Sequence, residues 1–319
     1  MSDTIASLRR KIGSAGALRS VVRTMKAMAA SSIGHYERSV LALADYARTV
    51  ELGLGASLRA ASLGDDGTTA TSPAWTRPLD AGPIVAIVFG SDQGLVGRFN
   101  DVVAADALEA LSALPGEPTV WAVGERVHAR LADAGLPLAA LFAVPASVEA
   151  ITGLVGRILV ESEALQRPGT GFELHLFYNR PGTGEVYAPV RQRLLPLDDA
   201  WSRGLAERPW PTNRRPEILG GDAGTLRALV REHLFVSLFR ACAESLSSEN
   251  ASRLAAMQRA DRNIEEVLEG LEGTSRRLRQ SGIDQELFDV ISGYEALSDP
   301  SSGARPHRAG RAIAQGGRT

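Results

Sequence analysis

The chain has 319 residues, of which 44% are hydrophobic and 23% are charged, as is ordinary for a soluble globular protein. Its 35 basic and 37 acidic side chains leave a net charge of -2, so nothing calls for nucleic acid or an acidic membrane surface as partner. The single cysteine, Cys242, excludes an intrachain disulfide and favours a reducing compartment. We find no secretory signal and no apolar stretch near the roughly 20 residues that a membrane-spanning helix needs. Work at a membrane would therefore depend on partners.

The distribution of proline divides the chain into three zones. Proline is absent from two arms, one near each end, and nearly all of the 16 prolines fall between them. Because proline removes a backbone donor and clashes with the preceding helical turn, two long helices should flank a globular domain. The predicted domains are an N-terminal coiled-coil helix (1–59), an α/β domain (60–221) that begins with a linker or loop (60–80), a C-terminal coiled-coil helix (222–297) and a disordered basic tail (298–319).

The first arm has the apolar spacing of a coiled coil. Apolar or small residues recur at steps of mostly three and four, and Arg19 interrupts the pattern. Gly13, Gly16 and Gly34 each weaken the helix by about 1 kcal/mol relative to Ala, so this helix needs a partner. The predicted seam consists of Ile5, Leu8, Ile12, Ala15, Val22, Met25, Ala29, Ile33, Tyr36, Val40, Leu43, Ala47 and Val50.

The third arm supplies the partner helix. Its apolar residues recur every seven positions, and Asp222 can cap its start. At about 1.5 Å per residue, this helix would be on the order of 110 Å long. We expect the two arms to pair antiparallel, with the far end of the third arm extending past the first or packing elsewhere. The seam residues are Met257, Ile264, Leu271 and Leu278, with Leu254 and Leu268 beside them.

The middle zone alternates between strands and helices. Such alternation is typical of a mostly parallel sheet with helices on its faces, so we expect a Rossmann-like α/β domain. The fold class is thus α/β with long helices, in which an antiparallel coiled coil flanks that domain. The predicted strands are 83–89, 119–123, 171–178 and 184–193, and the predicted helices are 102–114, 125–134 and 147–165.

A glycine-rich turn follows the first predicted strand, with Gly90, Gly94 and Gly97 in the sequence GSDQGLVG. Glycines before a helix can bring backbone donors close to a pyrophosphate. However, the spacing is not G-x-G-x-x-G, and the chain has no Gly-Lys-Ser/Thr triplet. We therefore favour a structural turn, stabilised by Asp92 and Asn100, over a nucleotide site.

No other pattern points to chemistry. The five histidines show no helical spacing of metal ligands, and no G-x-S-x-G elbow is present. Cys242 lies between two alanines in a predicted helix, as a small buried apolar residue does. We expect no catalytic residue, no metal and no cofactor.

Several segments, taken in chain order, are similar to the ATP synthase gamma subunit family. Together they cover nearly the whole chain, and their combination is more specific than any one of them. Gln93 and Val96 depart from the family pattern, which leaves open a divergent or paralogous cation-pumping branch. The matching segments are 21–30, 90–100, 177–179, 191–197, 237–254 and 283–293.

The resemblance implies a central rotor stalk without catalytic residues, in a proton- or sodium-transporting two-sector ATPase. Its partners would be a hexamer of alpha and beta subunits, the epsilon subunit and a ring of c subunits, with no nucleic acid. It would lie on the cytoplasmic face of a bacterial inner membrane, held there by partners, and would not act as a homo-oligomer.

The same resemblance suggests Met25, Lys26, Gln285 and Glu286 as contacts to the hexamer. In an alternative interpretation, Met25 is a seam residue and the other three form a solvated face. Two other functions stay open at this stage. One is a coiled-coil scaffold with an embedded α/β module, and the other is a nucleotide-dependent α/β enzyme with helical appendages.

Overall fold

The computed structural model describes residues 4–63, 82–166, 172–214, 216 and 222–298. Most of the predicted linker, the basic tail and the side chain of the predicted cap Asp222 lie outside the described residues. The chain divides into two compact units. The larger unit spans residues 20–262, and the smaller unit combines residues 1–19 with 263–319.

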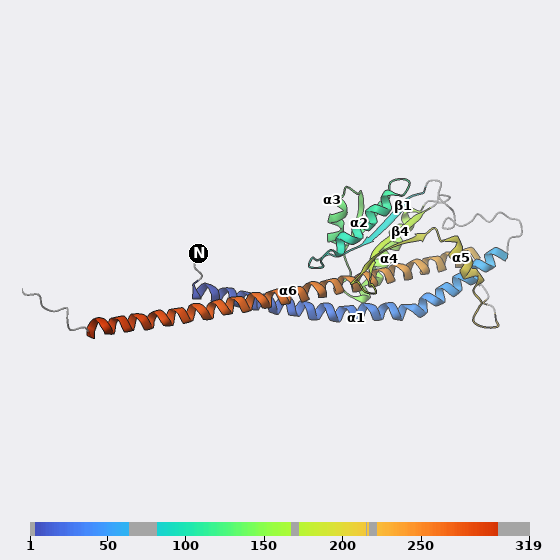
Figure 1. Cartoon of the computed structure of the whole chain (residues 1–319). Coiled ribbons are helices and arrows are strands. Elements are labelled where there is room, and N and C mark those ends of the chain that lie inside the picture. The colour runs from blue at the N-terminus through green and yellow to red at the C-terminus, as the bar shows by residue number, and fades with distance from the viewer. Residues whose placement is uncertain (1–3, 64–81, 167–171, 215, 217–221, 299–319) are drawn as a thin grey trace, which may run out of the picture. The chain divides into compact units, whose positions relative to one another are not determined.

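Two helices run through both units, α1 (Ile5–Leu63) and α6 (Asp222–Ser298). Within the larger unit they pair antiparallel (Figure 1). Lys26 of α1 lies 3.0 Å from Asp261 of α6, whereas Tyr46 farther along α1 donates to Glu232, which comes earlier in α6. The predicted antiparallel helix pair is therefore confirmed in this unit.

The heptad pattern of α1 determines which of its residues are buried. Val22, Ala29, Tyr36 and Val50 are separated by multiples of seven, and all are at most 6% exposed. Residues at this spacing return to the same side of a paired helix, where apolar burial stabilises the pairing. The glycines of α1 within the larger unit do not prevent the pairing of the helices, because the buried apolar residues continue along the same side of α1.

A five-stranded sheet forms the centre of the larger unit. The strands are β1 (Ile84–Phe89), β2 (Thr119–Val123), β3 (Leu138–Phe142), β4 (Glu173–Arg180) and β5 (Ala188–Leu195). They lie in the order β3-β2-β1-β4-β5, and only β5 is antiparallel to its neighbour. The expected Rossmann-like arrangement is confirmed, with the order of the parallel strands reversing between β1 and β4.

Helices cover both faces of this sheet (Figure 1). One core joins the sheet to α2 (Phe99–Ser112) and α3 (Glu125–Asp133). The other core joins the opposite face to α4 (Val148–Leu165), α1 and α6, and includes Leu54 and Leu238, both 0% exposed. The helix pair is therefore part of the packed core of the α/β unit.

Two elements were not predicted from the sequence. Strand β3 reads LAALF, a run that suits a helix as well as a strand, and it becomes a strand by pairing with β2. Helix α5 (Asp199–Glu207) begins where the Asp198 carboxylate accepts a hydrogen bond from the Trp201 backbone at 2.8 Å. Helix α2 begins at Phe99, three residues before the predicted start.

In the smaller unit, α1 and α6 also face each other. Leu8 is 1% exposed, and Arg19 forms an ion pair with Glu265. The position that interrupts the apolar pattern of α1 is thus used for a polar contact between the helices. Ile5 lies fourteen residues before Arg19 in α1, and Arg279 lies fourteen residues after Glu265 in α6. Because the two helices are antiparallel, Ile5 lies level with Arg279. Leu278, predicted on the seam, is 37% exposed because α1 begins at this level.

Candidate functional site

The glycine-rich turn connects β1 to α2 at the carboxyl ends of the parallel strands. Asp92 in this turn accepts two backbone hydrogen bonds, from Glu125 at 3.0 Å and from Val144 at 2.9 Å. Glu125 is the first residue of α3, and Val144 follows β3. The carboxylate therefore ties together the segments that follow β1, β2 and β3.

Asn100 holds the same turn from the first turn of α2. Its Oδ1 accepts a hydrogen bond from the Ser91 backbone at 2.9 Å, and its Nδ2 donates to the Ser91 hydroxyl at 2.8 Å. Asn100 is 8% exposed, so both bonds form away from bulk water. Asn100 is therefore occupied by protein partners on both sides of its amide.

Two of the three predicted turn glycines have an identifiable structural reason. A Cβ at Gly90 would lie 2.3 Å from the Cβ of Val127, so α3 can approach the turn only if residue 90 has no side chain. Gly97 has a φ of +57°, a conformation that glycine adopts without strain. A Cβ at Gly94 would lie 3.8 Å from the Arg126 guanidinium, an ordinary contact distance, so the space around residue 94 does not require glycine.

The space at this edge of the sheet is occupied by protein groups. Nucleotides in doubly wound folds bind outside the carboxyl ends of the strands. Here the Asp92 carboxylate lies at that place, and Ser252 of α6 donates to the Val96 carbonyl at 2.5 Å. A phosphate group would meet a carboxylate of the same charge. The geometry therefore favours a structural turn over a nucleotide site.

A buried polar segment of α6 packs beneath the turn. Glu249 and Arg253 form an ion pair at 2.6 Å, with side chains 8% and 13% exposed. Burial raises the pKa of Glu249, and the neighbouring Arg253 opposes that rise. Four serines of the same segment are also buried, namely Ser245, Ser247, Ser248 and Ser252. This segment, which carries one of the family-like motifs, fixes α6 to the α/β part of the larger unit.

Met25 and Lys26, two of the four predicted contact residues, lie on α1 in the larger unit. Met25 is partly buried. Lys26 binds Asp261 of α6 at 3.0 Å, and Arg23 binds the same carboxylate at 3.4 Å. The Asp261 side chain is 14% exposed, so Lys26 connects the two helices while keeping part of its own surface accessible.

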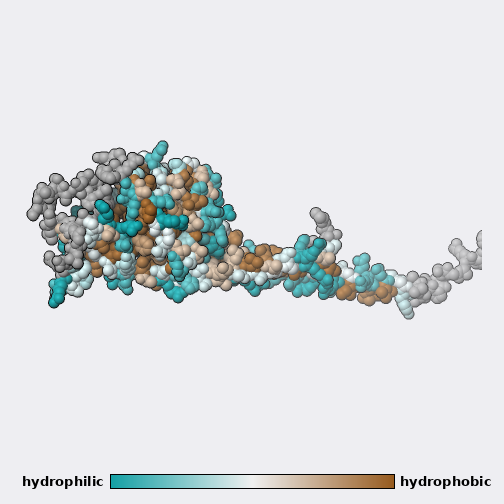
Figure 2. Space-filling view, turned by 180° about the vertical axis from the view of Figure 1, so that it is seen from behind, coloured by the Kyte–Doolittle hydropathy of each residue, from teal (hydrophilic) through white to brown (hydrophobic). Residues whose placement is uncertain are grey.

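Gln285 and Glu286 lie on α6 in the smaller unit, and both are exposed. They belong to a different unit from Met25 and Lys26. Around Gln285 and Glu286, apolar side chains recur at helical spacing, and Figure 2 shows brown apolar surface near the described end of α6. We call these residues the apolar stripe; they are Ile283, Leu287, Val290, Ile291 and Tyr294, which are between 45% and 72% exposed.

Sequence reasoning missed Asp261, although a signal for it exists. Asp261 follows the seam residue Met257 by four positions, and Lys26 follows the seam residue Val22 by four. Positions that flank a coiled-coil seam commonly form ion pairs between helices. Ser252 was missed as well, and nothing in the sequence links it to Val96, which lies 156 residues earlier.

Two further properties of the described residues concern the requirements of a membrane-spanning helix and of a metal site. Among residues 4–63, 82–166, 172–214 and 222–298, no helix has both the length and the apolar character needed to cross a membrane. The same described residues contain no group of three His, Cys, Asp or Glu side chains arranged to hold a metal ion.

The sequence matches a family model described as ATP synthase over residues 4–297. Curated relatives include the ATP synthase gamma chain of Parafrankia sp. (strain EAN1pec), which is 25% identical over 93% of this chain and 99% of the relative. The gamma chain of Methylobacterium nodulans is 27% identical over 92% of this chain and 99% of its own.

Solved structures share the fold. A chain of the Euglena gracilis mitochondrial ATP synthase, in a structure of OSCP, F1 and the c-ring, matches with a TM-score of 0.59 at 15% identity. The match covers 96% of this chain and 99% of that one. A chain of the Tetrahymena thermophila mitochondrial ATP synthase, in a structure of the central stalk and c-ring, has a TM-score of 0.52 at 17% identity. It covers 75% of this chain and 99% of that one.

Proposed function

The chain belongs to the ATP synthase family, and from this premise we propose that it works as the gamma subunit, the central rotor stalk. The observation that carries the proposal is the paired α1 and α6 with a heptad seam, in a chain that gamma chains match over 92–95% of its length. The rotor couples the rotation of an ion-driven ring to the conformational cycle of catalytic beta subunits. The chemistry of ATP belongs to those partners.

The proposed assembly follows from the relatives. The partners are a hexamer of alpha and beta subunits, the epsilon subunit and a ring of c subunits. This proposal is supported by the fold shared with a chain from an ATP synthase structure of OSCP, F1 and the c-ring. The ring transports protons or sodium ions, and the chain is held through its partners at the cytoplasmic face of a bacterial inner membrane.

The apolar stripe on α6 is the surface best suited to turn against a partner. Apolar contacts have no preferred direction, so a ring of apolar side chains can surround the stripe without strong polar bonds that would have to break at every step. Gln285 and Glu286 border the stripe and contact the hexamer there. Met25 contributes to a second contact on α1, in the larger unit.

Torque transmission requires that α1 and α6 do not slip past each other. The heptad seam resists slipping because a shift along either helix would expose buried side chains. The bonds of Lys26 and Arg23 to Asp261 add a polar constraint on the register. In this proposal Lys26 acts within the stalk as well as at its surface.

The proposal can be tested with two neighbouring substitutions on α1. Ala29 is 2% exposed on the seam, whereas Ala30 is exposed. Ala29→Glu buries an unpaired carboxylate in the seam, and Ala30→Glu places the same charge in solvent. Each tagged chain is purified from cells with its partners, and ATP hydrolysis and ion pumping by the complex are measured.

The wild-type chain and Ala30→Glu should copurify with alpha and beta subunits and pump ions when ATP is added. Ala29→Glu should lose pumping, either by failure to assemble or by uncoupled hydrolysis. If the wild-type chain purifies without alpha and beta subunits and associates with itself, the scaffold interpretation replaces this one.

A further inference from the structure

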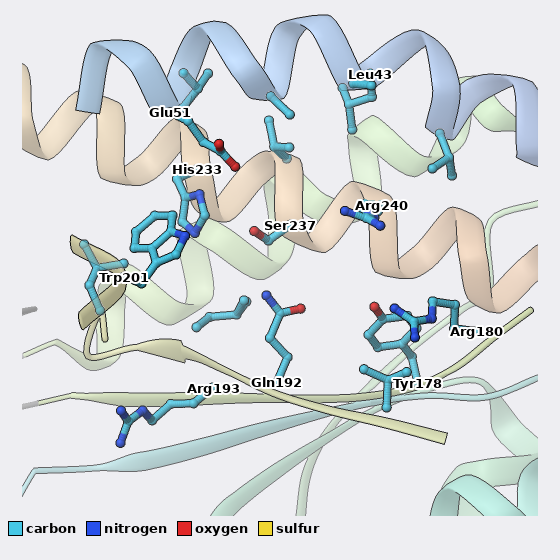
Figure 3. Close-up of a pocket in the computed structure, with 18 of the residues that line it drawn as sticks. Leu43, Glu51, Tyr178, Arg180, Gln192, Arg193, Trp201, His233, Ser237 and Arg240 are labelled. Carbon is cyan, nitrogen blue, oxygen red and sulfur yellow. The ribbon is translucent and has the colours of Figure 1, made fainter. Parts of the chain in front are cut away.

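A cavity of about 660 Å³ lies within the larger unit, between the helix pair and the edge of the sheet (Figure 3). The inner faces of α1 and α6 form one wall, and strands β4 and β5 form the other. Trp201 of α5 closes one end. Small-molecule sites in proteins are commonly 300–1,000 Å³, so the cavity has the size for one small organic ligand.

Three polar side chains face this cavity and have no hydrogen bond or ion pair among the described residues; Arg180 and Gln192 are exposed, and Ser237 is partly buried. Figure 3 shows the amide of Gln192 pointing from β5 toward α6, where the Ser237 hydroxyl faces it across the cavity. Within the described part of the chain, neither group has a hydrogen bond and Arg180 has no ion pair. Side chains with unused hydrogen-bonding capacity around one cavity are the usual means by which a site orients a ligand.

Positive charge gathers at one end of the cavity. The guanidinium groups of Arg180 and Arg240 both act on the Tyr178 phenol, and Arg240 is paired with Glu244 at 2.8 Å. Burial and the neighbouring Glu244 carboxylate raise the pKa of Tyr178 to about 12, so the phenol stays protonated, with Glu244 as its hydrogen-bond partner. Since Glu244 offsets one of the two guanidinium charges, this end retains a net positive charge that suits a single anionic group.

The other end and the long wall are mostly apolar. The rings of Trp201 and His233 are in contact, with centroids 4.7 Å apart and planes tilted by 40°, which gives this end an aromatic surface. Leu43 and Val50 line the wall from α1. Two carboxylates line the cavity there, and both have partners. Glu51 is paired with Arg208 at 2.8 Å, and Asp198 accepts a hydrogen bond from the Trp201 backbone at 2.8 Å and lies 3.9 Å from Arg193.

We propose that this cavity is a binding site for an aromatic monoanion, with a carboxylate or sulfonate at Arg180 and a ring system against Trp201. Such a ligand would contact α1, α6, β5 and α5 at once. It would therefore stiffen the junction between the helix pair and the sheet. This site is separate from the glycine turn, and the proposal does not depend on the rotor function.

The test uses 8-anilinonaphthalene-1-sulfonate as the probe and the full-length chain as the protein. Fluorescence titration should give saturable binding to one site. Arg180→Met removes the cation at the anionic end and should weaken binding about tenfold or more, as loss of a charge-assisted hydrogen bond does. Gln192→Trp fills the cavity from β5 and should abolish the saturable binding of the probe.

Arg193→Met is the matched control. Arg193 is on the same strand as Gln192 and also lines the cavity, but Figure 3 shows its guanidinium pointing away from Gln192 and Ser237. The substitution Arg193→Met removes the same charge as Arg180→Met and should leave the affinity for the probe unchanged. Circular dichroism checks that each variant is folded; if Gln192→Trp unfolds, the comparison of Arg180→Met with Arg193→Met decides.

The proposal is overturned if no saturable phase is observed. It is also overturned if Arg180→Met binds the probe as the wild type does, or if Arg193→Met weakens binding as much as Arg180→Met. If the Gln192→Trp variant folds and still binds the probe as the wild type does, the probe binds to other apolar surface, such as the apolar stripe. That result would also contradict the proposal.

Discussion

Asp92→Ala should destabilise the larger unit, because one carboxylate accepts two backbone hydrogen bonds from distant segments. The bond from Glu125 is at an exposed position and contributes roughly 0.5–1.5 kcal/mol, and the part-buried bond from Val144 contributes roughly 1.5–3 kcal/mol. Their combined loss is about 2–4.5 kcal/mol in the free energy of unfolding. For a unit of this size, that corresponds to a fall in Tm on the order of 10 °C.

The assay is urea unfolding of the purified chain, followed by circular dichroism. Asp133→Ala is the control: Asp133 is an exposed residue of α3 that has no ion pair or hydrogen bond among the described side chains. It removes the same charge and should change the unfolding free energy by less than about 0.5 kcal/mol. Equal losses for Asp92→Ala and Asp133→Ala would refute the structural role assigned to Asp92.

Three other predictions concern packing, pH and the helix pair. Gly90→Ala should cost about 3 kcal/mol or prevent folding, because the new Cβ would overlap Val127; urea unfolding measures this, and a neutral result would contradict the close approach. Burial lowers the pKa of His233, so the unfolded chain binds an extra proton below its ordinary pKa of about 6.5 and the fold loses stability as the pH falls through that value. His233→Gln should flatten the dependence of unfolding free energy on pH between about 5 and 7, and an unchanged slope would argue against a buried neutral imidazole. A double-mutant cycle of Lys26→Ala and Asp261→Ala should give a coupling of roughly 0.2–1 kcal/mol, because the pair is partly solvated, and a coupling of zero at low salt would exclude it as a register constraint.

The helix pair was predictable because its signal is local and repeated. The heptad spacing of α1 identifies Val22, Ala29, Tyr36 and Val50, and the structure buries all four in the larger unit. It also buries Leu54 and Ser57, which lie beyond the predicted seam. A period that continues over many turns leaves little ambiguity about which side of a helix faces a partner. Three strands of the parallel part of the sheet, β1, β2 and β4, were also predictable, and β1 has the clearest signal because it is a continuous run of buried apolar residues.

Other parts of the fold depend on contacts between distant residues. Strand β3 has no local preference that separates it from a helix, and β2 decides its state. The expectation that Asp92 and Asn100 stabilise a turn came from their place beside glycines, but the partners of Asp92 lie 33 and 52 residues away. The spacing of residues along the sequence does not predict contacts between residues so far apart in the chain.

The contact residues remain predictions for a related reason. Met25, Lys26, Gln285 and Glu286 were chosen by resemblance, and their roles depend on partner surfaces. The sequence did contain the clue that Lys26 faces α6, in its position beside the seam. The domain boundaries and the cellular location likewise remain predictions, because they depend on more than the described residues of one chain.

The most direct test of the rotor function is to observe rotation of this chain within its complex. Cys242 is buried and is the only cysteine, so Glu117→Cys, at an exposed turn after α2, supplies one accessible thiol for a bead or fluorescent label. The complex is immobilised through its beta subunits, and ATP is added. Rotor function predicts steady rotation of the label in one direction, which stops when ATP is exhausted. A complex that hydrolyses ATP while the label stays fixed relative to the beta subunits would contradict it.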